Sequence, residues 1–63
     1  MKDTIRFNAK KIRDAAAQGS VSAGERLGLM VLHDYIVFAA HDRNVPEDVR
    51  EYAQQQLVTL PQL

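Results

Sequence analysis

The 63-residue sequence contains no cysteine and no tryptophan, only two prolines and only three glycines. Without cysteine, neither a disulfide framework nor a thiolate metal site can stabilise a small fold. The absence of cysteine is also more usual in a cytosolic protein than in a small secreted one. Because the chain is near the lower limit for independent folding, we expect one domain, 1–63, held together by helix packing, oligomerisation or both.

The sequence also lacks a long uninterrupted apolar run. The longest apolar-rich stretch, 27–40, is interrupted by Gly28, His33 and Asp34, and a membrane span needs about 20 apolar residues. The first six residues do not contain the apolar segment of a signal peptide. We therefore expect a cytoplasmic protein that does not enter a membrane.

No residue pattern typical of catalysis or metal binding is present. The sequence has no phosphate-binding loop, dinucleotide fingerprint or glycosidase-type acid pair. His33 and His41 are eight positions apart, about 12 Å along a helix, so they cannot share one metal ion. Asp34 follows His33 directly and points in another direction, while Ser20 and Ser22 fit helix capping better than nucleophilic catalysis. The sequence predicts no enzyme, no metal and no cofactor.

Glycine and proline divide the chain into three predicted helices. The first is expected at about 8–18, with Asn8 as the N-cap and Gly19 at the left-handed C-terminal position. A start at Asp3 fits nearly as well. Residues 4–7 alternate between polar and apolar as a short strand does, but a helix is favoured there.

The second helix has the clearest start signal. Ser22 and Glu25 have the spacing of a capping box and predict a helix over about 23–42. Pro46 is a favoured first-turn residue and predicts a third helix over about 46–59. The fold class that we expect is therefore all-α, a three-helix domain with a long, highly apolar central helix.

Apolar residues cover more than half of the circumference of this central helix, beyond the stripe of about 100° that a surface helix buries. The first and third helices have narrow apolar faces and cannot cover all of it. We therefore predict a homodimer in which the central helix pairs with its copy. The predicted interface consists of Leu27, Gly28, Val31, Leu32, Tyr35, Phe38 and Ala39. Alternatively, the uncovered strip binds a different protein.

The leading hypothesis is a non-enzymatic interaction module that binds a larger protein and regulates or inhibits it. Arg13, Tyr35 and Tyr52 are predicted partner-binding residues, because arginine and tyrosine dominate binding hot spots. Asp34 is a further candidate that would bind a lysine or arginine of the partner. The alternative is that Asp34 lies at the rim of the interface or pairs internally with Arg13 or Arg26. Small regulators of this kind are often encoded by mobile genetic elements such as phages and plasmids, an association by size alone.

Charge is unevenly distributed although the net charge is zero. Residues 1–14 contain five Lys and Arg against two Asp, and residues 15–63 contain three Arg against six Asp and Glu. A basic segment can bind phosphates. The alternative hypothesis is therefore a small dimeric transcriptional regulator that contacts nucleic acid through Arg6, Lys10, Lys11 and Arg13.

Three partial resemblances accompany these hypotheses. Residues 4–7 resemble the N-terminal strand of ribbon-helix-helix proteins, and residues 19–22 resemble their inter-helix turn, although the segment between them is shorter than that family needs. Ala15 and Gly19 match the first half of a helix-turn-helix pattern, whose second half is not matched. Separate short segments of the chain resemble the theta subunit family of bacterial DNA polymerase III, although the spacing between these segments departs from that of the family. That resemblance would imply an accessory subunit of a replication complex. Its pieces are Pro46-Glu47, Arg50, Tyr52 and Leu57, with Gly19 and Glu25-Arg26 upstream.

Overall fold

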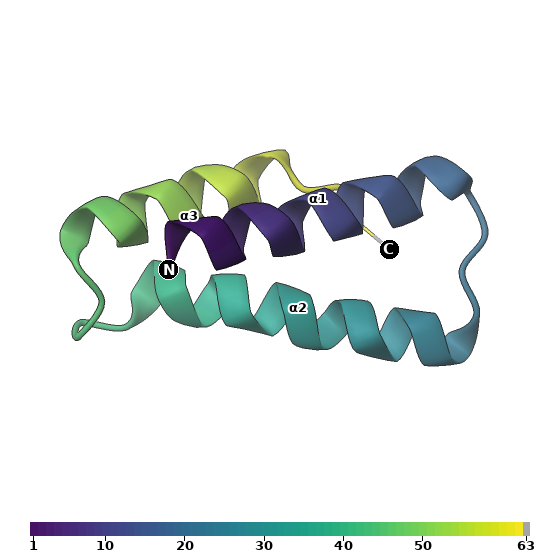
Figure 1. Ribbon diagram of the computed structural model, residues 1–63, viewed down its shortest axis with the longest axis horizontal. Helices are drawn as coiled ribbons and strands as arrows, with labels where there is room; N and C mark the ends of the chain where they lie inside the picture. Colours follow the sequence, from purple (N-terminus) through teal and green to yellow (C-terminus); the bar gives the residue numbers. More distant parts are fainter. Residues whose placement is uncertain (63) are drawn as a thin grey trace.

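The computed structural model describes residues 1–62 and is a bundle of three helices, each antiparallel to the one before it. They are α1 (Lys2–Gln18), α2 (Ala23–His41) and α3 (Glu47–Thr59), and the described residues contain no strand. The chain runs along the bundle in α1, returns in α2 and runs forward again in α3 (Figure 1). The predicted all-α, three-helix fold is confirmed.

Helix α1 begins six residues earlier than predicted. Met1 is its N-cap, and the backbone N–H of Ile5 donates to the carbonyl oxygen of Met1 at 3.0 Å. Asn8 is therefore inside the helix, and its side chain is buried instead of capping the first turn. Residues 4–7 are helical, so the strand alternative is wrong, and with it the strand of the ribbon-helix-helix resemblance.

The first connection has the two predicted caps, Gly19 and Ser22, although Glu25 accepts from the hydroxyl of Ser22 and not from its backbone N–H. Gly19 has φ 77°, and its N–H donates to the carbonyl oxygen of Ala16 at 3.2 Å. Left-handed backbone favours glycine because a Cβ there collides with the following carbonyl. At the start of α2, the Glu25 N–H donates to Ser22 Oγ at 3.2 Å, and Ser22 Oγ donates to Glu25 Oε1 at 2.9 Å. Ser22 is thus the N-cap, as predicted.

The second connection is closed by Asp42. Its Oδ1 accepts from the N–H of Asn44 at 2.8 Å, and its backbone carbonyl accepts from the N–H of Val45 at 3.1 Å. Val45 is buried beneath this turn. Pro46 is the N-cap of α3 rather than its first helical residue, one position from the prediction.

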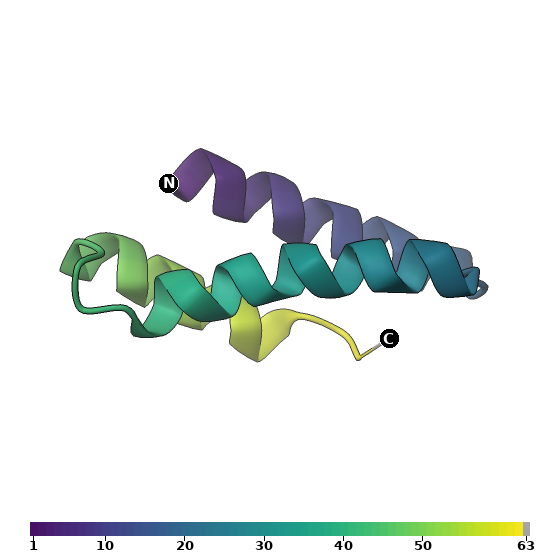
Figure 2. The ribbon, with the colours of Figure 1, turned by 90° about the horizontal axis from the view of Figure 1, so that it is seen from below.

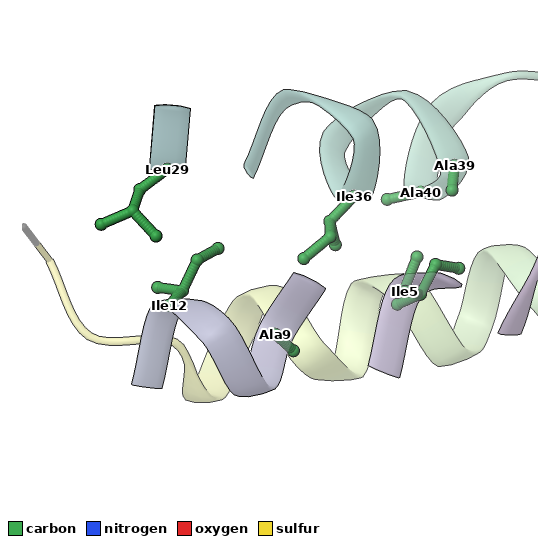
Figure 3. Packing of buried hydrophobic residues seen from close by; sticks show 8 residues of the cluster. Ile5, Ala9, Ile12, Leu29, Ile36, Ala39 and Ala40 are labelled. Carbon is green, nitrogen blue, oxygen red and sulfur yellow. The ribbon is translucent and has the colours of Figure 1, made fainter. Parts of the chain in front are cut away.

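The core contains three fully buried isoleucines and several alanines. Leu29 and Ile36 of α2 point toward α1, from which Ile5 and Ile12 point back (Figure 3). Alanine side chains let the helices approach closely, because they occupy little space between the backbones. They are Ala9, Ala39, Ala40 and Ala53. Two side-chain amides also join the helices: Asn8 Nδ2 donates to the carbonyl oxygen of Leu32 at 3.2 Å, and Gln54 Nε2 donates to that of Ala40 at 2.8 Å.

Candidate protein-binding surface

Helix α2 has one side that neither α1 nor α3 covers. Seen from that side, α2 is nearest to the viewer and the other two helices lie behind it (Figure 2). The core residues of α2 are Leu29, Ile36, Ala39 and Ala40. Since a helix repeats every 3.6 residues, side chains at intervals of four and three from Leu27 lie on the side opposite these core residues. We name this side the outer face of α2: Leu27, Met30, Val31, Asp34 and Phe38.

Four of the five residues on the outer face of α2 are large and apolar. Leu27 and Val31 are each 65% exposed, Met30 is 53% exposed and Phe38 is 50% exposed. Full burial of such a side chain contributes about 1.5–3 kcal/mol, so covering the exposed half of all four would yield about 4 kcal/mol. That is comparable with the total stability of a small domain, about 0.05–0.15 kcal/mol per residue. An exposed apolar patch of this kind is more typical of a binding site than of an ordinary solvent-exposed surface.

Asp34 is the charged residue of the outer face. It is exposed, and no ion pair joins it to a cation within residues 1–62. Within the same residues, neither of the predicted internal pairs, with Arg13 or with Arg26, is formed. The guanidinium of Arg13 donates from Nη2 to Gln56 Oε1 at 2.9 Å and to Thr59 Oγ1 at 2.8 Å. Arg13 thus connects α1 to α3. The carboxylate of Asp34 is available for a group from outside the chain.

An open groove of about 510 Å³ borders the outer face between α2 and the C-terminal end of α3. Met30 and Asp34 belong to both the groove and the outer face. Much of the wall is aliphatic, and His33, which is half-buried, adds an imidazole. The lining residues are Ile12, Met30, His33, Asp34, Leu57, Leu60, Pro61 and Gln62. The combined surface therefore has an apolar ridge, one carboxylate and an adjoining groove.

The residues predicted for a dimer interface are divided between the surface and the core. Leu27, Gly28, Val31 and Phe38 are exposed, and the half-buried ring of Tyr35 lies 6.5 Å from that of Phe38. Two further positions, 32 and 39, face inward. Leu32 packs against the core, and Ala39 is fully buried within it, so a second copy cannot reach it. The sequence prediction omitted Met30, although its position three residues after Leu27 indicates the same face.

Tyr52, a predicted partner-binding residue, contacts two cations of α1. It is half-buried, with Lys2 Nζ 5.9 Å and Arg6 Cζ 5.8 Å from the centroid of its ring. Cations at this distance are attracted to the face of an aromatic ring. Tyr52 therefore helps to pack α3 against α1.

The basic residues predicted to contact nucleic acid also have intramolecular partners. Arg6 Nη1 lies 2.8 Å from Asp3 Oδ1, and Lys10 Nζ lies 2.8 Å from Asp14 Oδ2. The hydrogen bond to Asp3 is the main cause that raises the pKa of Arg6. Lys11 Nζ lies 5.5 Å from the centre of the exposed Phe7 ring. Two of these four cations have a carboxylate partner, and Arg13 is bonded to uncharged groups of α3. Residues 1–14 still contain three more positive than negative side chains.

The described part of the chain contains no group of three or more His, Asp or Glu side chains placed to hold a metal ion. Among residues 1–62, no helix has both the length and the apolar composition needed to cross a membrane. No protein-family model, curated protein or solved structure gives a significant match to the chain.

Proposed function

We propose that this protein is a non-enzymatic interaction module that binds a larger protein through the outer face of α2 and thereby regulates or inhibits it. The observation that carries the proposal is the set of four half-exposed to two-thirds-exposed apolar side chains on one side of one helix. Such a surface gains free energy when another apolar surface covers it. A chain of this size acts most simply by occupying a surface that its partner needs for something else.

The outer face resembles a binding site in its residue types as well as in the exposure of its apolar side chains. Phenylalanine and methionine are enriched in the buried centres of interfaces, and Phe38 and Met30 contribute both types here. The predicted homodimer would use the same side of α2, because Leu27, Val31 and Phe38 are the predicted dimer residues that are both large and exposed. A second copy and a different protein therefore compete for one surface.

The experiment that tests the proposal compares capture by matched surface variants. The chain would be immobilised and exposed to an extract of the cells that produce it, and captured proteins would be quantified by mass spectrometry. Val31→Glu and Phe38→Glu place a charge on the outer face. Val58→Glu is the matched control, because Val58 is 85% exposed but lies on α3. Circular dichroism would verify that all variants are equally helical.

We expect one defined protein to be captured by the wild type and by Val58→Glu, and to be reduced at least tenfold with either variant of the outer face. The reduction follows from the cost of burying an unpaired carboxylate in an apolar interface. Equal capture by all four proteins would overturn the proposal.

A further inference from the structure

We infer that the partner of the outer face is an amphipathic helix with a lysine or arginine that binds Asp34, the aliphatic part of that side chain lying in the adjoining groove. This inference rests on the proposed function and specifies the chemistry of the partner. The observations that carry it are the position of Asp34, the lining of the groove and the spacing of the apolar residues.

Asp34 lies between apolar residues along the ridge, on the side of the ridge that borders the groove. It follows Val31 by three positions and precedes Phe38 by four. Any partner that covers both apolar side chains also removes water from the carboxylate between them. A buried charge is tolerated when it is paired and hydrogen-bonded, and is strongly unfavourable when it is not. The partner must therefore supply a cation at this position.

The groove beside Asp34 fits the side chain that would carry this cation. Lysine and arginine have long aliphatic stems that pack on apolar surface while the charged end binds elsewhere. The half-buried Leu57 and Leu60 provide such an aliphatic lining, and the carboxylate of Asp34 is part of the same groove. A guanidinium can bind a carboxylate through two parallel hydrogen bonds, which makes arginine the better fit of the two.

The spacing of the outer face favours a helix as the element that binds. Leu27, Val31, Asp34 and Phe38 follow one another at intervals of four, three and four, the spacing at which two helices pack along a common seam. From the first of these positions to the last, the ridge extends for about 16 Å, or three helical turns. A partner helix of about the same length would cover it.

The outer face of a second copy contains no Lys or Arg to place against Asp34. Two-fold pairing that places Leu27 against Phe38 of the copy leaves the two Asp34 residues about 4.5 Å apart along the axis, on helices about 8–10 Å apart. Arg26 is the one Lys or Arg in α2, and it lies about 100° around the helix from Leu27. Self-pairing would therefore bring two carboxylates together in an apolar interface.

The test is a selection from a phage-displayed helix library. Each member would be an amphipathic 18-residue helix with a fixed leucine seam and one randomised position at the centre of that seam. Selection would be performed on the wild-type protein, on Asp34→Arg, on Asp34→Asn and on Phe38→Glu. Asp34 is exposed, so these variants should fold, and circular dichroism would verify it.

With the wild type we expect Arg and Lys at the randomised position to be enriched at least tenfold over Asp and Glu. Asp34→Arg should reverse that preference, and Asp34→Asn should abolish it while still selecting helices with the leucine seam. Binders without a charge preference would overturn the inference and leave the proposed function standing. If no helix is enriched on the wild type relative to Phe38→Glu, the inference fails, and the capture experiment decides the proposed function separately.

Sedimentation of the wild-type protein supplies the second measurement. We expect a monomer at concentrations up to 100 μM at neutral pH. A dimer that dissociates when Phe38 is changed to glutamate would show that a second copy covers the outer face, and would overturn the inference.

Discussion

The side-chain amide of Asn8 donates a hydrogen bond to the backbone carbonyl oxygen of Leu32 across 3.2 Å, and so joins α1 to α2 at a buried position. Asn8 is 4% exposed, the one polar residue among the buried side chains of residues 1–62. A buried amide in such a place is stabilising because its hydrogen bond replaces those it made to water. The bond also fixes how α1 lies along α2, because it joins one particular position on each helix.

Removal of this hydrogen bond should destabilise the protein. We expect Asn8→Ala to lower the free energy of unfolding by about 1–2 kcal/mol, since it removes the bond and leaves a small cavity in place of the amide. Urea denaturation followed by circular dichroism measures the change. Thr4→Ala is the control on the same helix, at an exposed position, and should change stability by less than about 0.5 kcal/mol. Equal effects of the two substitutions would contradict the role assigned to Asn8.

Alanine substitutions at two glycines should have opposite effects. Gly19→Ala should destabilise by about 1–2 kcal/mol, because Gly19 has φ 77° and a Cβ is strained in that conformation. Gly28→Ala should stabilise by about 0.5–1 kcal/mol, because Gly28 lies within α2 and alanine is the better helix former. A Cβ at either position would have no atom within 4 Å, so neither change is affected by crowding. Thermal denaturation of the two variants beside the wild type measures the sign of each change in stability. A shift of both melting temperatures in the same direction would refute the argument from backbone conformation.

Substitutions at two β-branched residues of α2 should differ in their effect on stability, because one residue is buried and the other is exposed. Ile36 is fully buried and Val31 is 65% exposed. We expect Ile36→Val to cost about 0.5–1.5 kcal/mol for one methyl group removed from the core. Val31→Ala should change stability by no more than about 0.5 kcal/mol, because most of its side chain already contacts water. Guanidinium denaturation distinguishes the two, and a larger loss for Val31→Ala would show that the outer face of α2 is packed in the free protein.

The ion pair between α1 and α3 should make stability depend on pH in the acid range. Lys2 Nζ lies 3.3 Å from Asp48 Oδ2, and its hydrogen bond lowers the pKa of Asp48 from the ordinary value of 3.8. A carboxylate whose pKa is lowered by folding stabilises the folded state above its unfolded pKa. That contribution disappears as the pH falls through the folded pKa.

Carbon-13 NMR titration of the Asp48 carboxyl carbon measures this effect directly. We expect Lys2→Met to bring the pKa of Asp48 back toward its ordinary value. Lys11→Met is the control, because Lys11 lies beside the Phe7 ring. This control variant should have the same pKa of Asp48 as the wild type. The melting temperatures of wild type and Lys2→Met should differ near pH 6 and converge near pH 2. Equal melting temperatures of the two proteins at neutral pH would exclude a contribution of the ion pair to stability.

The features that the sequence alone determined are those decided by neighbours in the chain. Gly19 ends α1, Ser22 begins α2 and Pro46 precedes α3, because left-handed backbone, a side-chain cap and a fixed φ are local properties of one residue and its next few neighbours. The periodicity of the central segment likewise predicted more apolar positions than two narrow neighbouring helices can bury.

Only the tertiary structure decided how residues far apart in sequence are used. Asn8 has the side chain of an N-cap, yet it lies inside α1, and the carbonyl oxygen of Leu32, 24 positions away, accepts its hydrogen bond within the bundle. Arg13 donates hydrogen bonds to Gln56 and Thr59 of α3, more than 40 positions away. Of two adjacent residues in α2, Ala39 is buried and Phe38 is half-exposed. Periodicity places such residues on different sides of a helix, but which side meets water depends on where α1 and α3 pack, and that is decided by the whole chain at once.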